Sequence, residues 1–128
     1  MTHASGSFDV RLTAQQTADP VVGRMTIDKQ YHGDLEAAAN GEMLTAMTEV
    51  KGSAGYVAIE HVTGRLNGRT GSFMLQHSGT MNRGTPQLSV SVVPDSGAGE
   101  LAGLTGKMDI IIDAGKHSYK FEYSLPER

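Results

Sequence analysis

Residues 56–80 read YVAIEHVTGRLNGRTGSFMLQHSGT, two runs of alternating apolar and polar residues joined by Asn67-Gly68. Asn-Gly is the preferred pair for a two-residue type I′ turn, and such a turn fixes the register of the strands on either side. Folding the chain about this turn predicts an antiparallel hairpin. Its cross-strand pairs are Leu66 with Arg69, Val62 with Phe73, Glu60 with Leu75, and Ala58 with His77.

A second hairpin is predicted around Ala114-Gly115 in residues 107–125, which read KMDIIIDAGKHSYKFEYSL. Its outer face would carry three oppositely charged pairs, and these support the register: Asp113 with Lys116, Asp109 with Lys120, and Lys107 with Glu122. A slip of one residue would turn the isoleucines toward water. The other face pairs Ile112 with His117, Ile110 with Tyr119, and Met108 with Phe121. The predicted buried residues are Met108, Ile110, Ile112, Tyr119, Phe121, Tyr123 and Leu125.

The same alternation recurs at 8–13, 25–28, 35–48 and 88–93, so the chain contains eight candidate strands. The third of these is expected to be interrupted at Asn40-Gly41, and a single helical turn is expected near Glu100. The 16 Gly and 4 Pro of the 128 residues separate the strands. These patterns predict an all-β fold, an eight-stranded antiparallel up-and-down barrel, with a two-sheet sandwich as the alternative. One domain is expected over residues 1–128, with the ordered barrel at about 6–125.

Composition excludes several classes of protein. The chain has no Cys, so it contains no disulfide, thiolate metal site or cysteine nucleophile. A formal net charge of −3 argues against nucleic-acid binding. No apolar run approaches the roughly 18 residues of a membrane span, and the first residues lack the pattern of a signal peptide, so a cytoplasmic protein is expected. The five His form no metal motif, and His3 is expected in a frayed terminus; neither a metal nor a cofactor is predicted.

Four short blocks carry a resemblance to a known family: 33–36 (GDLE), 41–44 (GEML), 75–81 (LQHSGTM) and 99–106 (GELAGLTG). In these blocks and in the spacing between them, the chain resembles an uncharacterised bacterial family of domains of unknown function, whose members form allene oxide cyclase-like β-barrels. The resemblance extends from about Gly6 to Leu125. The resemblance implies an eight-stranded barrel, commonly oligomeric, without an assigned activity. The wider superfamily includes plant allene oxide cyclases and some polyketide cyclases, which bind apolar substrates inside the barrel. Their site residues do not match positions in this chain, and none is carried over.

Glu60 and His77 are the candidate catalytic residues. The Asn67-Gly68 register makes them diagonal neighbours on the inward face, close enough for long side chains to meet. A desolvated carboxylate beside an imidazole suits a general acid/base pair. The alternative is a buried polar pair that satisfies itself without turnover.

Aromatic side chains are the candidate ligand contacts, and all of them except Tyr31, which is expected near the Gly33-Asp34 turn, are expected on the same inward face. Their rings suit an apolar pocket and the hydroxyls could orient a ligand carbonyl, although such residues also serve simply as core. The candidates are Tyr31, Tyr56, Phe73, Tyr119, Phe121 and Tyr123.

Lys29 belongs to the same set of alternate residues as the apolar Met25, Ile27 and Tyr31, so a regular strand would place all four on one face. Either a bulge turns it outward, or it enters the interior and pairs with a carboxylate such as Glu36 or Glu60. Because an unpaired buried ammonium is costly, the bulge is predicted.

Three functions remain from these observations. The first is a module that binds an apolar or aromatic small molecule inside the barrel. The second is a cyclase or isomerase that uses Glu60 and His77 as acid and base. The third is a structural or interaction protein with a solid core. A homo-oligomer, dimer or trimer, is expected, with Val57, Ile59 and Met74 at the interface; neither nucleic acid nor a membrane is expected as a partner.

Overall fold

The computed structural model describes residues 1–19 and 21–126, which form nine strands and no helix. Over this part of the chain there is accordingly no helix that could cross a membrane. The strands are β1 (Thr2–Gln15), β2 (Val22–Gly33), β3 (Leu35–Met47), β4 (Ala54–Leu66), β5 (Arg69–Asn82), β6 (Thr85–Val92), β7 (Ala98–Gly99), β8 (Thr105–Asp113) and β9 (Lys116–Ser124).

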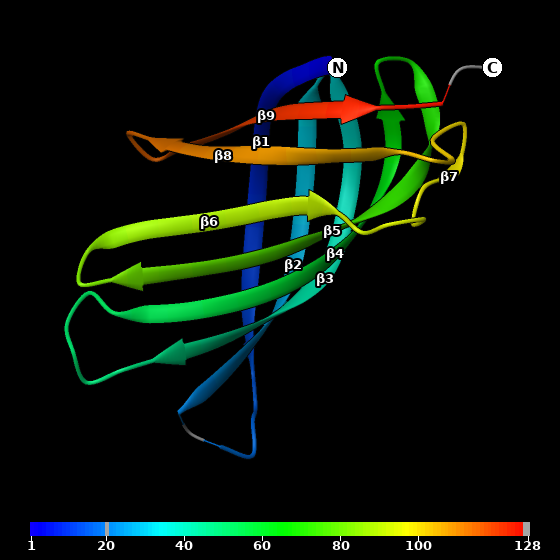
Figure 1. Ribbon diagram of the computed structural model, residues 1–128. Helices are drawn as coiled ribbons and strands as arrows, with labels where there is room; N and C mark the ends of the chain where they lie inside the picture. Colours follow the sequence, from blue (N-terminus) through cyan, green and yellow to red (C-terminus); the bar gives the residue numbers. More distant parts are fainter. Residues whose placement is uncertain (20, 127–128) are drawn as a thin grey trace.

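Eight of these strands close into an antiparallel barrel (Figure 1). The order around the ring is β1-β2-β3-β4-β5-β6-β8-β9, and β9 pairs again with β1. The short β7 pairs with β5 outside the ring. The predicted up-and-down barrel is therefore confirmed, and the sandwich alternative is excluded.

Both predicted hairpin registers are confirmed. Strands β4 and β5 pair Val62 with Phe73 and Glu60 with Leu75, and β8 and β9 pair all three predicted charged couples. The two turns have positive φ at both central residues, 47° and 85° at Asn67-Gly68 and 51° and 79° at Ala114-Gly115. This is the conformation that a type I′ turn requires.

Strand β3 differs from the prediction, because it runs without interruption through Asn40-Gly41. Gly41 lies where the backbones of β3 and β4 approach each other closely. A Cβ atom there would stand 2.0 Å from the carbonyl oxygen of Ile59. The glycine thus permits close strand packing and does not mark a turn.

The N-terminus and the loop before β8 also correct the sequence predictions. His3 is not in a frayed terminus: it lies in β1, pairs with Glu122 of β9, and its Nε2 is 3.2 Å from the Glu122 carboxylate. Near Glu100 the chain forms hydrogen-bonded turns and no helix. These turns bury Leu101 and Leu104 against one end of the barrel.

The interior has a packed half and an open half. The packed half lies near the β2–β3 and β4–β5 turns, where Phe73 and Phe121 stack with their ring centres 5.8 Å apart. At the open half the predicted core residue Ile112 is 67% exposed, because the end of the β8–β9 hairpin has no strand pairing to β6. Ile110 and Leu125 are half-buried.

The barrel wall is nearly open between β6 and β8. These strands share one residue pair, Ser91 with Lys107, whereas β5 and β6 are paired from Asn82–Thr85 to Leu75–Val92. From that single pair the two strands diverge toward the open half (Figure 1). Their facing edges form a wedge-shaped gap in the wall, which we call the β6–β8 seam.

Candidate functional site

Four polar side chains meet inside the barrel, where apolar residues would be expected to fill the space. Glu60 of β4 is completely buried, and Lys29 of β2 and His77 of β5 are 5% and 4% exposed. One carboxylate oxygen of Glu60 lies 2.8 Å from Lys29 Nζ and 2.6 Å from His77 Nε2. The other oxygen accepts a hydrogen bond from the hydroxyl of Tyr31. We call these four residues the buried cluster.

Lys29 corrects the predicted bulge. It lies in regular pairing with Val10 of β1 and Ala39 of β3, so its side chain points inward. The cost of burying the ammonium is offset by the carboxylate of Glu60 and by the ring of Phe8, whose centre is 4.7 Å from Nζ. Lys29 therefore takes the alternative position, paired with one of the two proposed carboxylates.

The protonation of the buried cluster follows from its contacts. Burial alone would raise the pKa of the Glu60 carboxyl, but the hydrogen bond from His77 and the charge of Lys29 outweigh burial and lower this pKa to about 2. Burial and the neighbouring carboxylate raise the pKa of Tyr31 far above its ordinary value. Glu60 is thus ionised at neutral pH, and Tyr31 stays a neutral donor.

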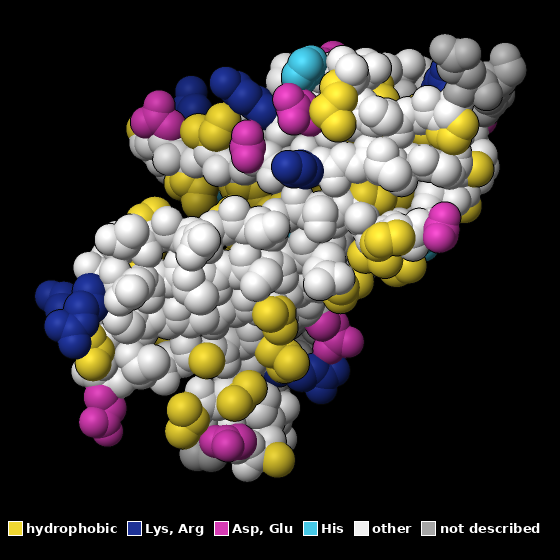
Figure 2. Space-filling model, viewed as in Figure 1, with side chains coloured by type: hydrophobic (Ala, Val, Ile, Leu, Met, Phe, Trp, Pro, Cys, Tyr) yellow, Lys and Arg dark blue, Asp and Glu magenta, His cyan; other side chains and the backbone are white. Residues whose placement is uncertain are grey.

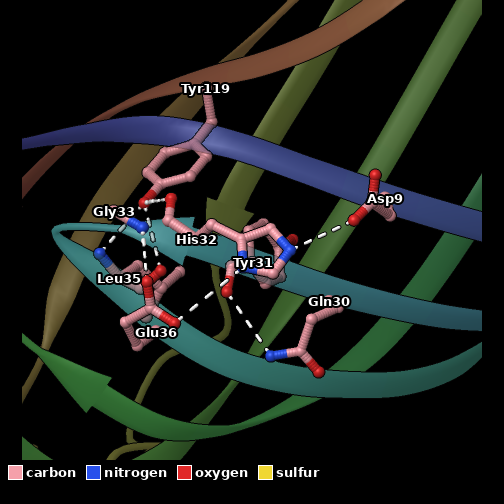
Figure 3. A network of polar contacts seen from close by, with 8 residues as sticks. All are labelled: Asp9, Gln30, Tyr31, His32, Gly33, Leu35, Glu36 and Tyr119. Atoms are coloured by element: carbon pink, nitrogen blue, oxygen red, sulfur yellow. Dashed lines mark hydrogen bonds and ion pairs between the residues drawn. The ribbon is translucent and has the colours of Figure 1, made fainter.

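Glu36, the other carboxylate considered for Lys29, lies elsewhere (Figure 3). It accepts a hydrogen bond of 2.8 Å from the backbone nitrogen of Gly33 at the β2–β3 turn. Beside it, the imidazole of His32 is 3.1 Å from the carboxylate of Asp9. These exposed contacts hold the outer surface of the turn and do not reach the buried cluster.

The predicted aromatic residues divide between the two halves of the interior. Tyr119 accepts a hydrogen bond from the backbone nitrogen of Leu35 at 2.9 Å, and donates to the carbonyl of His32 at 3.0 Å (Figure 3). Tyr123 accepts one from Asn67 at 2.6 Å. With Phe73 and Phe121, they fill the packed half, and their role as ligand contacts stays a prediction.

Tyr56 connects the buried cluster to a cavity in the open half. Its hydroxyl is 3.5 Å from Nδ1 of His77, and burial, followed by the charge of Glu60, raises the pKa of Tyr56. The cavity has a volume of about 450 Å³. Its walls come mainly from the apolar side chains of Met43, Met47, Met81, Leu88, Ile110 and Ile112.

The cavity opens along the β6–β8 seam, with Leu88 on one edge and Ile110 and Ile112 on the other. Figure 2 shows the hollow at this place, with hydrophobic side chains along it. The sequence predictions missed the methionines of this wall. The alternation in β3 and β5 indicates that these side chains point inward. It does not indicate how far they lie from the packed half.

No group of three or more His, Asp or Glu side chains suited to a metal occurs in the residues that the structure describes. The predicted acid and base do lie together, since Glu60 and His77 are hydrogen-bonded. Their catalytic role stays a prediction. Within the cluster Glu60 already accepts from three donors and is shielded from solvent, so it can act on a ligand only through His77.

Comparisons with known proteins agree with the fold. Residues 4–123 match the family described as "Protein of unknown function (DUF3224)". The crystal structure of a DUF3224 protein of unknown function from Shewanella oneidensis MR-1 is 53% identical, with a TM-score of 0.94 over 100% of this chain and 99% of that one. No curated protein matches the sequence. The allene oxide cyclase-like designation stays a prediction, but the chain belongs to the DUF3224 family.

Proposed function

We propose that the protein binds an apolar small molecule in the cavity of the open half. The observation that carries this proposal is the cavity itself, which combines a volume of about 450 Å³ with apolar walls. Small-molecule sites are typically clefts of roughly 300 to 1,000 Å³ with few polar groups. Here Tyr56 lines the cavity beside the apolar residues, and its hydroxyl is 3.5 Å from Nδ1 of His77 in the buried cluster.

The rim of the cavity supports the same proposal. Leu88 and Ile112 face each other across the β6–β8 seam and are 43% and 67% exposed. A ligand that covers large apolar side chains on both sides of one opening removes them from contact with water. This burial stabilises the complex by about 25 cal/mol for each Å² of apolar surface. The methionines of the wall have flexible, polarisable side chains and can adapt to ligands of different shapes.

Filling the cavity should abolish binding. Thr45 lines the cavity from β3 and is half-buried, so Thr45→Trp places an indole in the ligand's space. We expect the wild-type protein to bind the neutral apolar dye Nile red, and the variant to bind it at least about tenfold more weakly. The measurement is a fluorescence titration of both proteins.

Thr63→Trp is the matched control, since Thr63 is exposed on the outer face of β4. It adds the same indole without entering the barrel and should leave the dye affinity unchanged. Equal affinities in the wild type and Thr45→Trp, or no dye binding by the wild type, would reject the proposed site.

We also propose that the outer face of β3 and β4 joins copies of the chain in a dimer or trimer. Leu44 pairs directly with Val57 across these strands, and Ile59 follows on the same face of β4. All three are exposed, Val57 to 51%, and Met74, the third residue predicted at this interface, is exposed on the neighbouring strand β5. Adjacent exposed apolar side chains on a sheet face are typical of an interface.

A charge on this face should separate the copies. Val57→Lys is expected to shift the molecular mass in sedimentation equilibrium from that of an oligomer to that of the 13.6 kDa monomer. Thr63→Lys places the same charge on the outer face of the same strand, away from Leu44, and should leave the mass unchanged. A monomeric wild type would refute this interface.

A further inference from the structure

His77 joins the buried cluster to the cavity. Its Nε2 is 2.6 Å from Glu60, and its Nδ1 is 3.5 Å from the hydroxyl of Tyr56 on the cavity wall. Lys29 and Tyr31, on β2, face the imidazole across Glu60, whose oxygens they bind. An ionised carboxylate only accepts hydrogen bonds. Nε2 of His77 therefore carries a proton in both charge states of the ring, and only Nδ1 changes.

The charge of His77 sets the direction of the Tyr56 hydroxyl. When the imidazole is neutral, Nδ1 accepts the single hydroxyl proton, and Tyr56 offers only lone pairs to the cavity. When the imidazole is charged, Nδ1 donates to the Tyr56 oxygen, and the hydroxyl proton turns toward the cavity. The polar end of the cavity is thus an acceptor in one state and a donor in the other.

Charge balance favours one class of ligand. Lys29 and Glu60 carry opposite charges and cancel inside the barrel. An imidazolium at His77 would share the same carboxylate, 2.6 Å away, and would leave the buried cluster with a net positive charge. Such a charge is costly in an apolar interior unless an anion accompanies it. A carboxylate that accepts the Tyr56 hydroxyl proton supplies the anion, and charge-assisted hydrogen bonds are about twice as strong as neutral ones.

We propose that the preferred ligand has an apolar body and a single carboxylate, and that His77 takes up one proton when this ligand binds. The inference rests on the proposed function, because it names the ligand class for the same cavity. The body lies against Met43, Leu88 and Ile110, and the carboxylate lies at Tyr56. The relay then runs from Glu60 through His77 and Tyr56 to the ligand.

Octanoate and octanamide test this proposal, since they share one apolar chain and differ in the charge of the head. Isothermal titration calorimetry of the wild type in phosphate and in Tris at pH 8 measures the protons exchanged on binding. We expect octanoate to bind about tenfold more tightly than octanamide. About one proton is taken up with octanoate and none with octanamide, and the octanoate affinity falls as the pH rises.

Tyr56→Phe isolates the relay, because it removes the hydroxyl and keeps the ring on the cavity wall. It should abolish the preference for octanoate and its proton uptake, while the octanamide affinity stays within about twofold. His77→Gln should likewise abolish proton uptake. Because His77 is buried, replacing it can also unfold the protein. In that case Tyr56→Phe alone decides the test.

The outcomes separate the ligand class from the cavity itself. If Nile red binds but octanoate binds no better than octanamide, or binds without proton uptake, the carboxylate ligand is overturned and the cavity remains a binding site. If the wild type binds neither the dye nor the two probes, the proposed function fails, and the ligand class fails with it.

Discussion

Glu60→Gln is expected to lower the free energy of unfolding by about 3–5 kcal/mol, the usual loss when one partner of a buried ion pair is removed. The substitution keeps the volume of the side chain and deletes the charge. Lys29 is then left 5% exposed without an anion beside it, because its neighbours are the Tyr31 hydroxyl at 3.2 Å, the rings of Phe8 and Tyr31, and the neutral amide of the new side chain. Urea denaturation followed by circular dichroism measures the loss.

Two further variants show whether this loss comes from the stranded ammonium. Lys29→Met should cost less than Glu60→Gln, because Glu60 keeps the donors His77 and Tyr31. The double variant Lys29→Met/Glu60→Gln removes both charges and should return to within about 2 kcal/mol of the wild type. If the double variant instead loses the sum of the two single losses, the pair is uncoupled and the explanation is wrong.

The barrel could be predicted because short sequence patterns determine how the strands of its two hairpins are aligned. Asn67-Gly68 supplies the two positive φ angles of its turn, and the charged couples around Ala114-Gly115 are consistent with only one alignment. The error at Gly41 has a physical cause. A glycine that ends a strand and a glycine that allows two backbones to approach look alike in sequence, and only the neighbouring strand distinguishes them.

The candidate site was predictable in part for the same reason. The hairpin register brings Glu60 and His77 together on the inward face, and the structure places them in contact. Lys29 comes from β2, which is separated from β4 by β3, so its contact with Glu60 follows from two further registers, that of β2 with β3 and that of β3 with β4. Alternation also says which face a residue occupies but nothing of its depth. The sequence pattern therefore predicts that Ile112 is buried in the core, whereas the structure places it on the rim of the cavity.

Acidification is expected to remove about 3 kcal/mol of stability through Glu60 alone, mostly between pH 5 and pH 2. The ordinary pKa of this carboxyl is 4.5, and its contacts with His77 and Lys29 lower it to about 2 in the folded state despite burial. As the pH falls through 4.5, the Glu60 carboxyl takes up a proton in the unfolded chain but stays ionised in the folded chain. The contribution is thus complete above that pH and is lost as the pH approaches 2.

The double variant Lys29→Met/Glu60→Gln is the control for this pH dependence. It lacks the buried carboxylate and keeps the exposed ones, whose titration it shares with the wild type. Urea denaturation of both proteins from pH 7 to pH 2.5 should show the wild type losing stability faster on acidification, by up to about 3 kcal/mol over the range. Parallel curves would mean that Glu60 has no depressed pKa in the folded protein, and that the cluster of Lys29, Glu60 and His77 is not held by its charges.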